Sequence, residues 1–167
     1  MMDQAALTPH IPRLRRYARA LVGDRYAADD LVQDTLERAI NKFHLWRPGS
    51  DLRAWLFAIM HNVHVNQLRS RAARPETVLD DGDLLPQGRP DADRLELRDM
   101  QSAITALPIE QREVILLVAL EQLSYAEVSK ALDIPIGTVM SRLFRARERL
   151  RAQLGGAQIQ SNLKVVK

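Results

Sequence analysis

Apolar residues recur along the first part of the chain at intervals of three and four residues, which is the period of a helix rather than of a strand. The first such stretch follows Thr8 and Pro9, a capping hydroxyl and a proline suited to a first helical turn. It runs to Val22, and Gly23 can close it. We therefore expect a first helix that ends at Val22.

Two more helices are expected before residue 75. The second follows a helical spacing of apolar positions: Ala28, Leu31, Val32, Thr35, Leu36, Ala39, Ile40 and Phe43. After the break at 47–49, Ser50 and Asp51 offer caps for the third. Its inner face has Leu52, Trp55, Leu56, Ile59, Met60 and Val63, and its end, 69–74, is basic. Trp55 falls on this apolar stripe and is expected in the core.

Helical periodicity stops after Pro75, where prolines, glycines and seven acidic residues up to Glu96 outnumber two arginines. Such a composition cannot bury a core and predicts a flexible acidic linker. We therefore expect an all-α protein of two small helical domains, 1–74 and 92–155, joined by a linker at 75–91 and followed by a flexible tail at 156–167. Because the linker has few apolar residues, the two domains should move relative to each other.

The second domain has the helix lengths and the turn spacing of a helix-turn-helix. Periodicity returns at Leu97 and continues beyond Pro108 with the apolar run 114–120. Ser124 then caps a short helix that ends at Leu132, a tight turn follows at 133–135, and a longer helix runs from Gly137 to about Leu154. Asp133 stands where such turns usually have glycine in a left-handed conformation, which aspartate tolerates better than most side chains.

The last helix has two distinct faces. Its inner stripe is Val139, Leu143, Ala146 and Leu150, and its outer face is Thr138, Ser141, Arg142, Arg145 and Arg149. Arginines can form paired hydrogen bonds with guanine edges or phosphates, and small hydroxyl side chains allow a close approach to the major groove. The outer face therefore favours DNA binding, although an ordinary solvated basic face has the same pattern.

Composition removes several classes of function. The 167 residues contain no cysteine, so a thiolate metal site, a cysteine nucleophile and a disulfide framework are excluded. The longest apolar run has seven residues, far below the ~20 that cross a bilayer, and we expect a cytoplasmic protein without membrane insertion. The four histidines are scattered, and no phosphate loop or nucleophile motif is present. An enzyme, a metal and a cofactor are not expected.

Four segments in this order resemble the extracytoplasmic-function (ECF) sigma factors of bacterial RNA polymerase. They are DDLVQDTL at 29–36, LRAWLFAIMHN at 52–62, LSYAEV at 123–128 and GTVMSR at 137–142. The resemblance covers the chain from about Leu7 to Leu154, apart from the linker. It implies a first domain that binds the polymerase clamp helices and melts the minus-ten element. It implies a second domain that recognises the minus-thirty-five element and docks on the polymerase flap. An anti-sigma factor is a further implied partner.

The resemblance also assigns residues. Core polymerase would be bound by the acidic strip, Asp29, Asp30, Gln33, Asp34 and Glu37. At the downstream element, Trp46 and Asn62 match a pocket for a flipped base, while Asn66, Gln67, Arg69, Arg71 and Arg74 would contact the DNA strand. At the upstream element, the implied contacts are Arg112, Thr138, Met140, Ser141, Arg142, Phe144, Arg145 and Arg149. Two residues depart from the family, which often has aspartate at Asn66 and usually a basic residue at Met140.

Each assignment has a simpler alternative: a solvated helix face for the acidic strip, a core aromatic for Trp46, a surface amide for Asn62, and a solubilising helix end for the basic tail. Two other functions also remain open. One is a regulator whose only DNA contact is the helix-turn-helix. The other is a decoy that imitates a sigma factor and sequesters its inhibitor. Such decoys generally lack a basic recognition face and carry a phosphate-receiver domain, neither of which matches this sequence.

Overall fold

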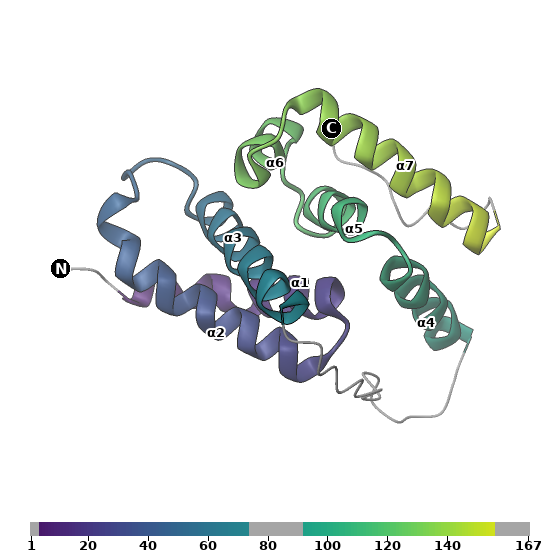
Figure 1. Cartoon of the computed structure of the whole chain (residues 1–167), viewed down its shortest axis with the longest axis horizontal. Coiled ribbons are helices and arrows are strands. Elements are labelled where there is room, and N and C mark those ends of the chain that lie inside the picture. Colours follow the sequence, from purple (N-terminus) through teal and green to yellow (C-terminus); the bar gives the residue numbers. More distant parts are fainter. Residues whose placement is uncertain (1–3, 74–91, 156–167) are drawn as a thin grey trace.

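The computed structural model describes residues 4–73 and 92–155, and within these ranges every regular element is a helix (Figure 1). The expected linker at 75–91 and tail at 156–167, together with Arg74, lie outside the described residues. The principal helices are α1 (Ile11–Val22), α2 (Arg25–Lys42), α3 (Leu52–Ala72), α4 (Ala92–Thr105), α5 (Ile109–Ile115), α6 (Tyr125–Leu132) and α7 (Ile136–Leu154). The all-α prediction is confirmed.

The ends of the first helices follow local chemistry. The segment Thr8–His10 forms a short 3-10 helix, η2, before α1. The expected Thr8 cap is therefore wrong, because the N-cap of α1 is His10, which makes no side-chain cap hydrogen bond. Helix α1 ends at Gly23 in the left-handed conformation, with φ 80°. Asp24 caps α2 by accepting hydrogen bonds from the backbone N–H groups of Tyr26 and Ala27, a cap that the sequence analysis did not identify. Asp51 caps α3 as expected.

Helices α1, α2 and α3 pack together and bury the predicted stripes. The core between them includes Leu14, Leu31, Leu56 and Met60, all essentially inaccessible to solvent. Tyr17 and Phe57 contact each other edge to face, with ring centroids 5.0 Å apart. Trp55 is half-buried at the margin of this core, where its ring contacts Phe43. The period of apolar residues therefore identified most of the buried faces of α2 and α3, although Ile40 is exposed and the buried Phe57 and His64 were not predicted.

The apolar run that begins at Val114 is not one continuous α-helix. Helix α5 ends at Ile115 and continues as a π-helical turn, η4 (Leu116–Leu120), which is followed by Gln122 in a left-handed conformation. The backbone N–H of Leu123 donates to the carbonyl of Leu117 and closes this end. The wider turn places Glu121 in the interior, where the sequence pattern gave no indication of a buried acid.

Helices α6 and α7 form the predicted helix-turn-helix. Ser124 and Glu127 make a reciprocal capping box at the start of α6. Asp133 adopts the expected left-handed conformation, with φ 53° and ψ 52°. Ser129 donates a hydrogen bond of 2.5 Å to the carbonyl of Ile134 and so ties α6 to the turn. The inner stripe of α7 is buried, as predicted.

The two groups of helices, residues 4–73 and 92–155, contact each other directly: α3 packs on α6, and α1 packs on α4 and η4 (Figure 1). Contacts between helices distant in sequence therefore determine the position of the second group in this structure. The expected movement of the two groups stays a prediction, because the linker on which it rests lies outside the described residues. Across the described residues, no helix is long and apolar enough to cross a membrane.

Candidate nucleic-acid and protein interfaces

The acidic strip lies on the outer side of α2. Asp29, Asp30, Gln33 and Glu37 are exposed, whereas Asp34 is half-buried. The opposite side of the helix packs into the core through Leu31 and Thr35. An exposed strip of carboxylates repels DNA and suits a basic protein surface.

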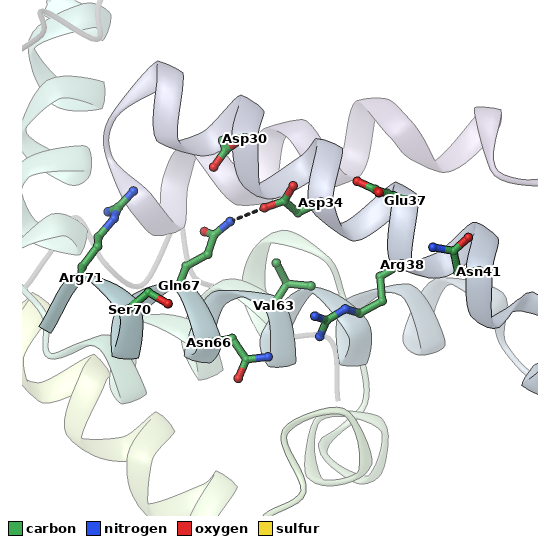
Figure 2. Close-up of a pocket in the computed structure, with 10 residues that line it drawn as sticks. All are labelled: Asp30, Asp34, Glu37, Arg38, Asn41, Val63, Asn66, Gln67, Ser70 and Arg71. Carbon is green, nitrogen blue, oxygen red and sulfur yellow. Dashed lines mark hydrogen bonds between the residues drawn. The ribbon is translucent and has the colours of Figure 1, made fainter. Parts of the chain in front are cut away.

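A groove of about 570 Å³ runs between α2 and α3, and the strip forms one of its walls (Figure 2). Its lining is Asp30, Asp34, Glu37, Arg38 and Asn41 from α2, and Val63, Asn66, Gln67, Ser70 and Arg71 from α3. Figure 2 shows the Gln67 side chain extended toward α2, where its amide donates a 2.9 Å hydrogen bond to Asp34. The groove therefore has three carboxylates on the α2 side and amide and hydroxyl groups on the α3 side, with one arginine on each side, Arg38 and Arg71.

Gln67 and Asn66 differ in their exposure to solvent. Gln67 is half-buried, and its side chain extends across the groove to Asp34 instead of pointing away from α2. Asn66 is exposed at the edge of the groove. Arg69 and Arg71 are exposed near the end of α3, and Arg71 lines the groove.

The two residues matched to a base pocket differ in environment. Asn62 is exposed on α3. Trp46 is half-buried, and its ring lies 5.3 Å from that of Phe43, which in turn contacts Trp55. The indole N–H of Trp46 is buried and has no hydrogen-bond partner among the described residues. Trp46 thus belongs to an aromatic cluster and still has an unused donor.

The outer face of α7 presents a mixture of basic and apolar side chains. Arg145 and Arg149 are exposed and Arg142 is half-buried, and none of the three forms an ion pair with another residue in the described part of the chain. Thr138 is half-buried and Ser141 exposed. Met140 and Phe144 are 53% and 64% exposed, one helical turn apart. All the α7 residues named by the resemblance therefore lie on or beside one accessible face.

Arg112 lies in a different environment from these residues. Its guanidinium donates to four backbone carbonyls: those of Ile104, Thr105, Leu107 and Leu21, at 2.6–3.0 Å. The first three end α4 and the last ends α1, so a single cation satisfies the carboxyl ends of two helices. Burial lowers the pKa of Arg112, partly offset by Glu113. In this arrangement Arg112 is engaged within the protein rather than presented to DNA.

Sequence reasoning missed a second polar contact between the groups of helices. Arg16 forms a 3.2 Å ion pair with the buried carboxylate of Glu121, and Arg53 donates a 3.0 Å hydrogen bond to the Glu121 carbonyl. Burial raises the pKa of Glu121, opposed by Arg16. Arg16 and Arg53 lie 105 and 68 residues before Glu121 in the sequence, so no local pattern connects them with it.

The described residues form an all-helical protein with a helix-turn-helix that has a basic outer face, and with a groove between α2 and α3 that is partly lined by carboxylates. Two family models match the chain: the Sigma2 domain of PhyR over residues 7–61 and Sigma-70, region 4, over residues 97–150. The chain is 37% identical to the ECF RNA polymerase sigma factor EcfG of Rhodopseudomonas palustris, over 86% of this chain and 80% of that protein. It is 38% identical to the ECF sigma factor SigC of Mycobacterium tuberculosis, over 80% and 73%. The chain belongs to the ECF sigma factor family.

Solved structures agree with this assignment. The sigma factor RpoE of Bartonella quintana, in complex with the anti-sigma factor NepR, has a TM-score of 0.77 and 33% identity, covering 92% of this chain and 97% of that one. CnrH, in complex with the cytosolic domain of CnrY, has a TM-score of 0.67 and 28% identity, covering 92% and 88%. The similarity thus extends over both groups of helices.

Proposed function

We propose that this chain is a dissociable subunit that directs RNA polymerase core to specific promoters and helps to open them. The observation that supports this most directly is the complete helix-turn-helix whose outer face has arginines with no ion-pair partner in the described ranges. Cations kept away from internal carboxylates are available to phosphates and to guanine edges. Arg142, Arg145 and Arg149, with Thr138 and Ser141, form the proposed upstream contact.

Polymerase core is proposed to dock on the acidic strip of α2, through its clamp helices, while its flap contacts the second group of helices. The strip lies beside an open groove, so a basic coiled coil could place side chains between α2 and α3. The tie between Gln67 and Asp34 holds one carboxylate at a fixed position in that groove. A chain that acts as a subunit of RNA polymerase would act in the cell interior, where the polymerase is.

Opening of the downstream element is proposed to use Asn62 and Trp46. An exposed amide can hydrogen-bond a base edge, and a ring with a free buried N–H can stack on or line a pocket for a flipped base. Asn66, Arg69, Arg71 and Arg74 would follow the strand, the last from outside the described residues.

An anti-sigma factor is proposed as the regulator, since two similar proteins were solved with inhibitors of this kind or with a cytosolic partner domain. The recognition helix offers a surface for it. Ile136, Met140 and Phe144 form an exposed apolar ridge at four-residue spacing, flanked by arginines. Occupation of this ridge would block duplex binding directly.

The alternative is a decoy that sequesters an anti-sigma factor. Residues 7–61 match the model of the Sigma2 domain of PhyR. PhyR of Bartonella quintana was solved as an anti-anti-sigma factor in complex with the anti-sigma factor NepR. Structures of this second kind are 18–22% identical and share only the fold. The basic outer face of α7 argues for DNA binding instead.

Run-off transcription with purified core polymerase separates the three candidate functions: a sigma factor, a helix-turn-helix regulator and a decoy. On a promoter library, a sigma factor yields discrete transcripts that depend on the added chain, and a helix-turn-helix regulator without polymerase-binding capacity does not. A decoy yields none but restores transcription by a related sigma factor that its inhibitor has silenced. Failure to produce any chain-dependent transcript in the presence of active core would refute the proposal.

A further inference from the structure

The outer face of α7 is divided along its length into an apolar side and a basic side. One side is the apolar ridge of Ile136, Met140 and Phe144, which are 49%, 53% and 64% exposed. These residues follow one another at four-residue intervals, so their side chains lie along one line of the helix surface. The basic side consists of Arg142, Arg145 and Arg149. By the helical period, Ser141 lies between the two sides.

The fold does not use the apolar ridge. The buried stripe of α7 lies on another side of the helix and consists of Val139, Leu143, Ala146 and Leu150. None of the three ridge residues belongs to the buried core or to the half-buried residues packed against it. A single exposed apolar side chain is ordinary, but three on one line form a continuous apolar surface. The ridge is therefore available to a partner.

The charge around the ridge favours duplex DNA as that partner. Helix α7 has five arginines and one acid, Glu148, and this acid pairs with Arg151 at 2.9 Å. The three arginines of the basic side have no ion-pair partner within residues 4–73 and 92–155. A cationic second helix of a helix-turn-helix is complementary to the polyanionic duplex and lies in its major groove. In that position the ridge lies beside the edges of the bases.

Met140 is the central residue of the ridge. It lies in the second turn of α7, and the first turns of a recognition helix are the part that reaches base edges. Its side chain has no hydrogen-bond donor, so it cannot pair with a phosphate or with the acceptors of guanine. The apolar group that the major groove presents is the 5-methyl group of thymine. We propose that Met140 selects a thymine in the upstream element by contact with this methyl group, an inference that rests on the proposed promoter recognition.

The contact predicts an affinity that depends on one methyl group. Burial of a methyl-sized apolar group contributes about fourfold in affinity. Deoxyuridine lacks only this methyl group and keeps the hydrogen-bonding edge of thymine, so it isolates the contact. 5-Methylcytosine has a methyl group at the same ring position, but it has a donor where thymine has the O4 acceptor. Recognition by Met140 should therefore follow the methyl group and not the hydrogen-bonding pattern.

The test uses the full chain bound to core polymerase, on a promoter chosen by run-off transcription. Affinity is measured by titration at constant ionic strength, with each thymine of the upstream element replaced in turn by deoxyuridine. For the wild-type chain, one such replacement should weaken binding by about fourfold. For Met140→Ala, the same replacement should have no effect, because the methyl group has lost its apolar partner. Cytosine at that position should weaken binding of the wild-type chain, and 5-methylcytosine should restore part of it.

Two variants control for changes other than the loss of this contact. Met140→Leu keeps an apolar side chain of similar volume and should retain most of the methyl dependence. Leu97→Ala removes a 63% exposed apolar side chain from α4 and should retain all of it. Thermal denaturation should give similar melting temperatures for Met140→Ala and the wild-type chain, since Met140 lies outside the core.

Chain-dependent transcription from promoters whose upstream element has no methyl-dependent thymine would overturn the inference and leave the proposed function standing. A methyl effect of equal size in Met140→Ala would also overturn it, because another side chain would then contact the methyl group. If the ridge serves a protein partner alone, Met140→Ala binds the promoter as the wild-type chain does, and the inference is wrong. Absence of any chain-dependent transcript would refute the inference and the proposed function together.

Discussion

Single side chains on α3 and α7 decide whether the proposed promoter contacts exist. Asn62 is an exposed amide whose removal disturbs no internal contact among the described residues, whereas Trp46 is also part of an aromatic cluster. Substitution of Trp46 therefore combines a loss of packing with any loss of base stacking, and Asn62 is the cleaner test of the pocket.

Asn62→Ala should leave the melting temperature and the binding of the upstream duplex unchanged but reduce open complex by roughly tenfold, since base-edge hydrogen bonds of this kind contribute ~1–3 kcal/mol. Permanganate footprinting measures the open strand. On a template already mismatched at the downstream element, the defect should persist as altered base preference. Normal opening with the wild-type preference would make Asn62 an ordinary surface amide.

Arg145→Ala should weaken binding to the upstream duplex by about 1–3 kcal/mol if the guanidinium pairs with a base, because a bidentate contact contributes that much discrimination. Arg151→Ala is the matched control on the same helix, since Arg151 pairs with Glu148 at 2.9 Å. Titrations with specific and scrambled duplexes compare the two variants. An equal loss of binding free energy on both duplexes would show that Arg145 contacts phosphate and not a base.

At the scale of elements, the helix-turn-helix depends on short-range interactions that can be predicted from the sequence. The capping box of α6 and the left-handed Asp133 position α7 relative to α6. The tie from Ser129 to Ile134 links the same two helices. Recognition by α7 therefore rests on the integrity of a turn that itself contacts no DNA in the proposed arrangement.

Ser124→Ala should lower the free energy of unfolding by about 1 kcal/mol, because it leaves the N–H of Glu127 without its cap. Ser102→Ala, at an exposed position of α4, should change it by less than about 0.5 kcal/mol. Urea denaturation followed by circular dichroism gives both values. Equal effects of the two substitutions would show that the capping box does not stabilise α6 measurably.

For the whole molecule, the arrangement of the two groups depends on a few polar residues placed at their boundary. Arg112 satisfies carbonyls on both sides of it, and Glu121 receives Arg16 and Arg53 from the other side. Buried charges of this kind contribute little net stability when fully paired, but removal of one partner is costly because the other group remains buried and unsatisfied.

Arg112→Ala should therefore destabilise the chain by about 2–4 kcal/mol, since four backbone carbonyls, three of them in partly buried hydrogen bonds, lose a charged donor. Arg112→Lys should recover only part of this, because an ammonium lacks the planar fork that reaches four acceptors. Denaturation curves compare both with Arg15→Ala, an exposed arginine of α1. If Arg112→Ala were as stable as that control, the guanidinium would not join the helix ends in solution.

The sequence by itself determined the helices, the caps at Asp51 and Ser124, most of the buried stripes of α2, α3 and α7, and the left-handed turn at Asp133. Each of these follows from interactions within a few residues, such as helical periodicity, capping side chains and backbone preference. The same local patterns placed the acidic strip and the basic outer face on exposed surfaces, which the structure confirms except at the half-buried Asp34, Thr138 and Arg142.

Only the tertiary structure decided how the two groups of helices meet and which polar residues lie between them. Between the groups, Arg112 donates to carbonyls at the ends of α1 and α4, and Glu113 lies against His61 and His64. Within the first group, Gln67 pairs with Asp34. The partners of Arg112 and Glu121 on the other group are 91 and 105 residues away. No periodicity in the sequence connects positions so far apart. Their pairing depends on the packing of α1 and α3 against the second group, which brings buried charge to partners that a local pattern cannot identify.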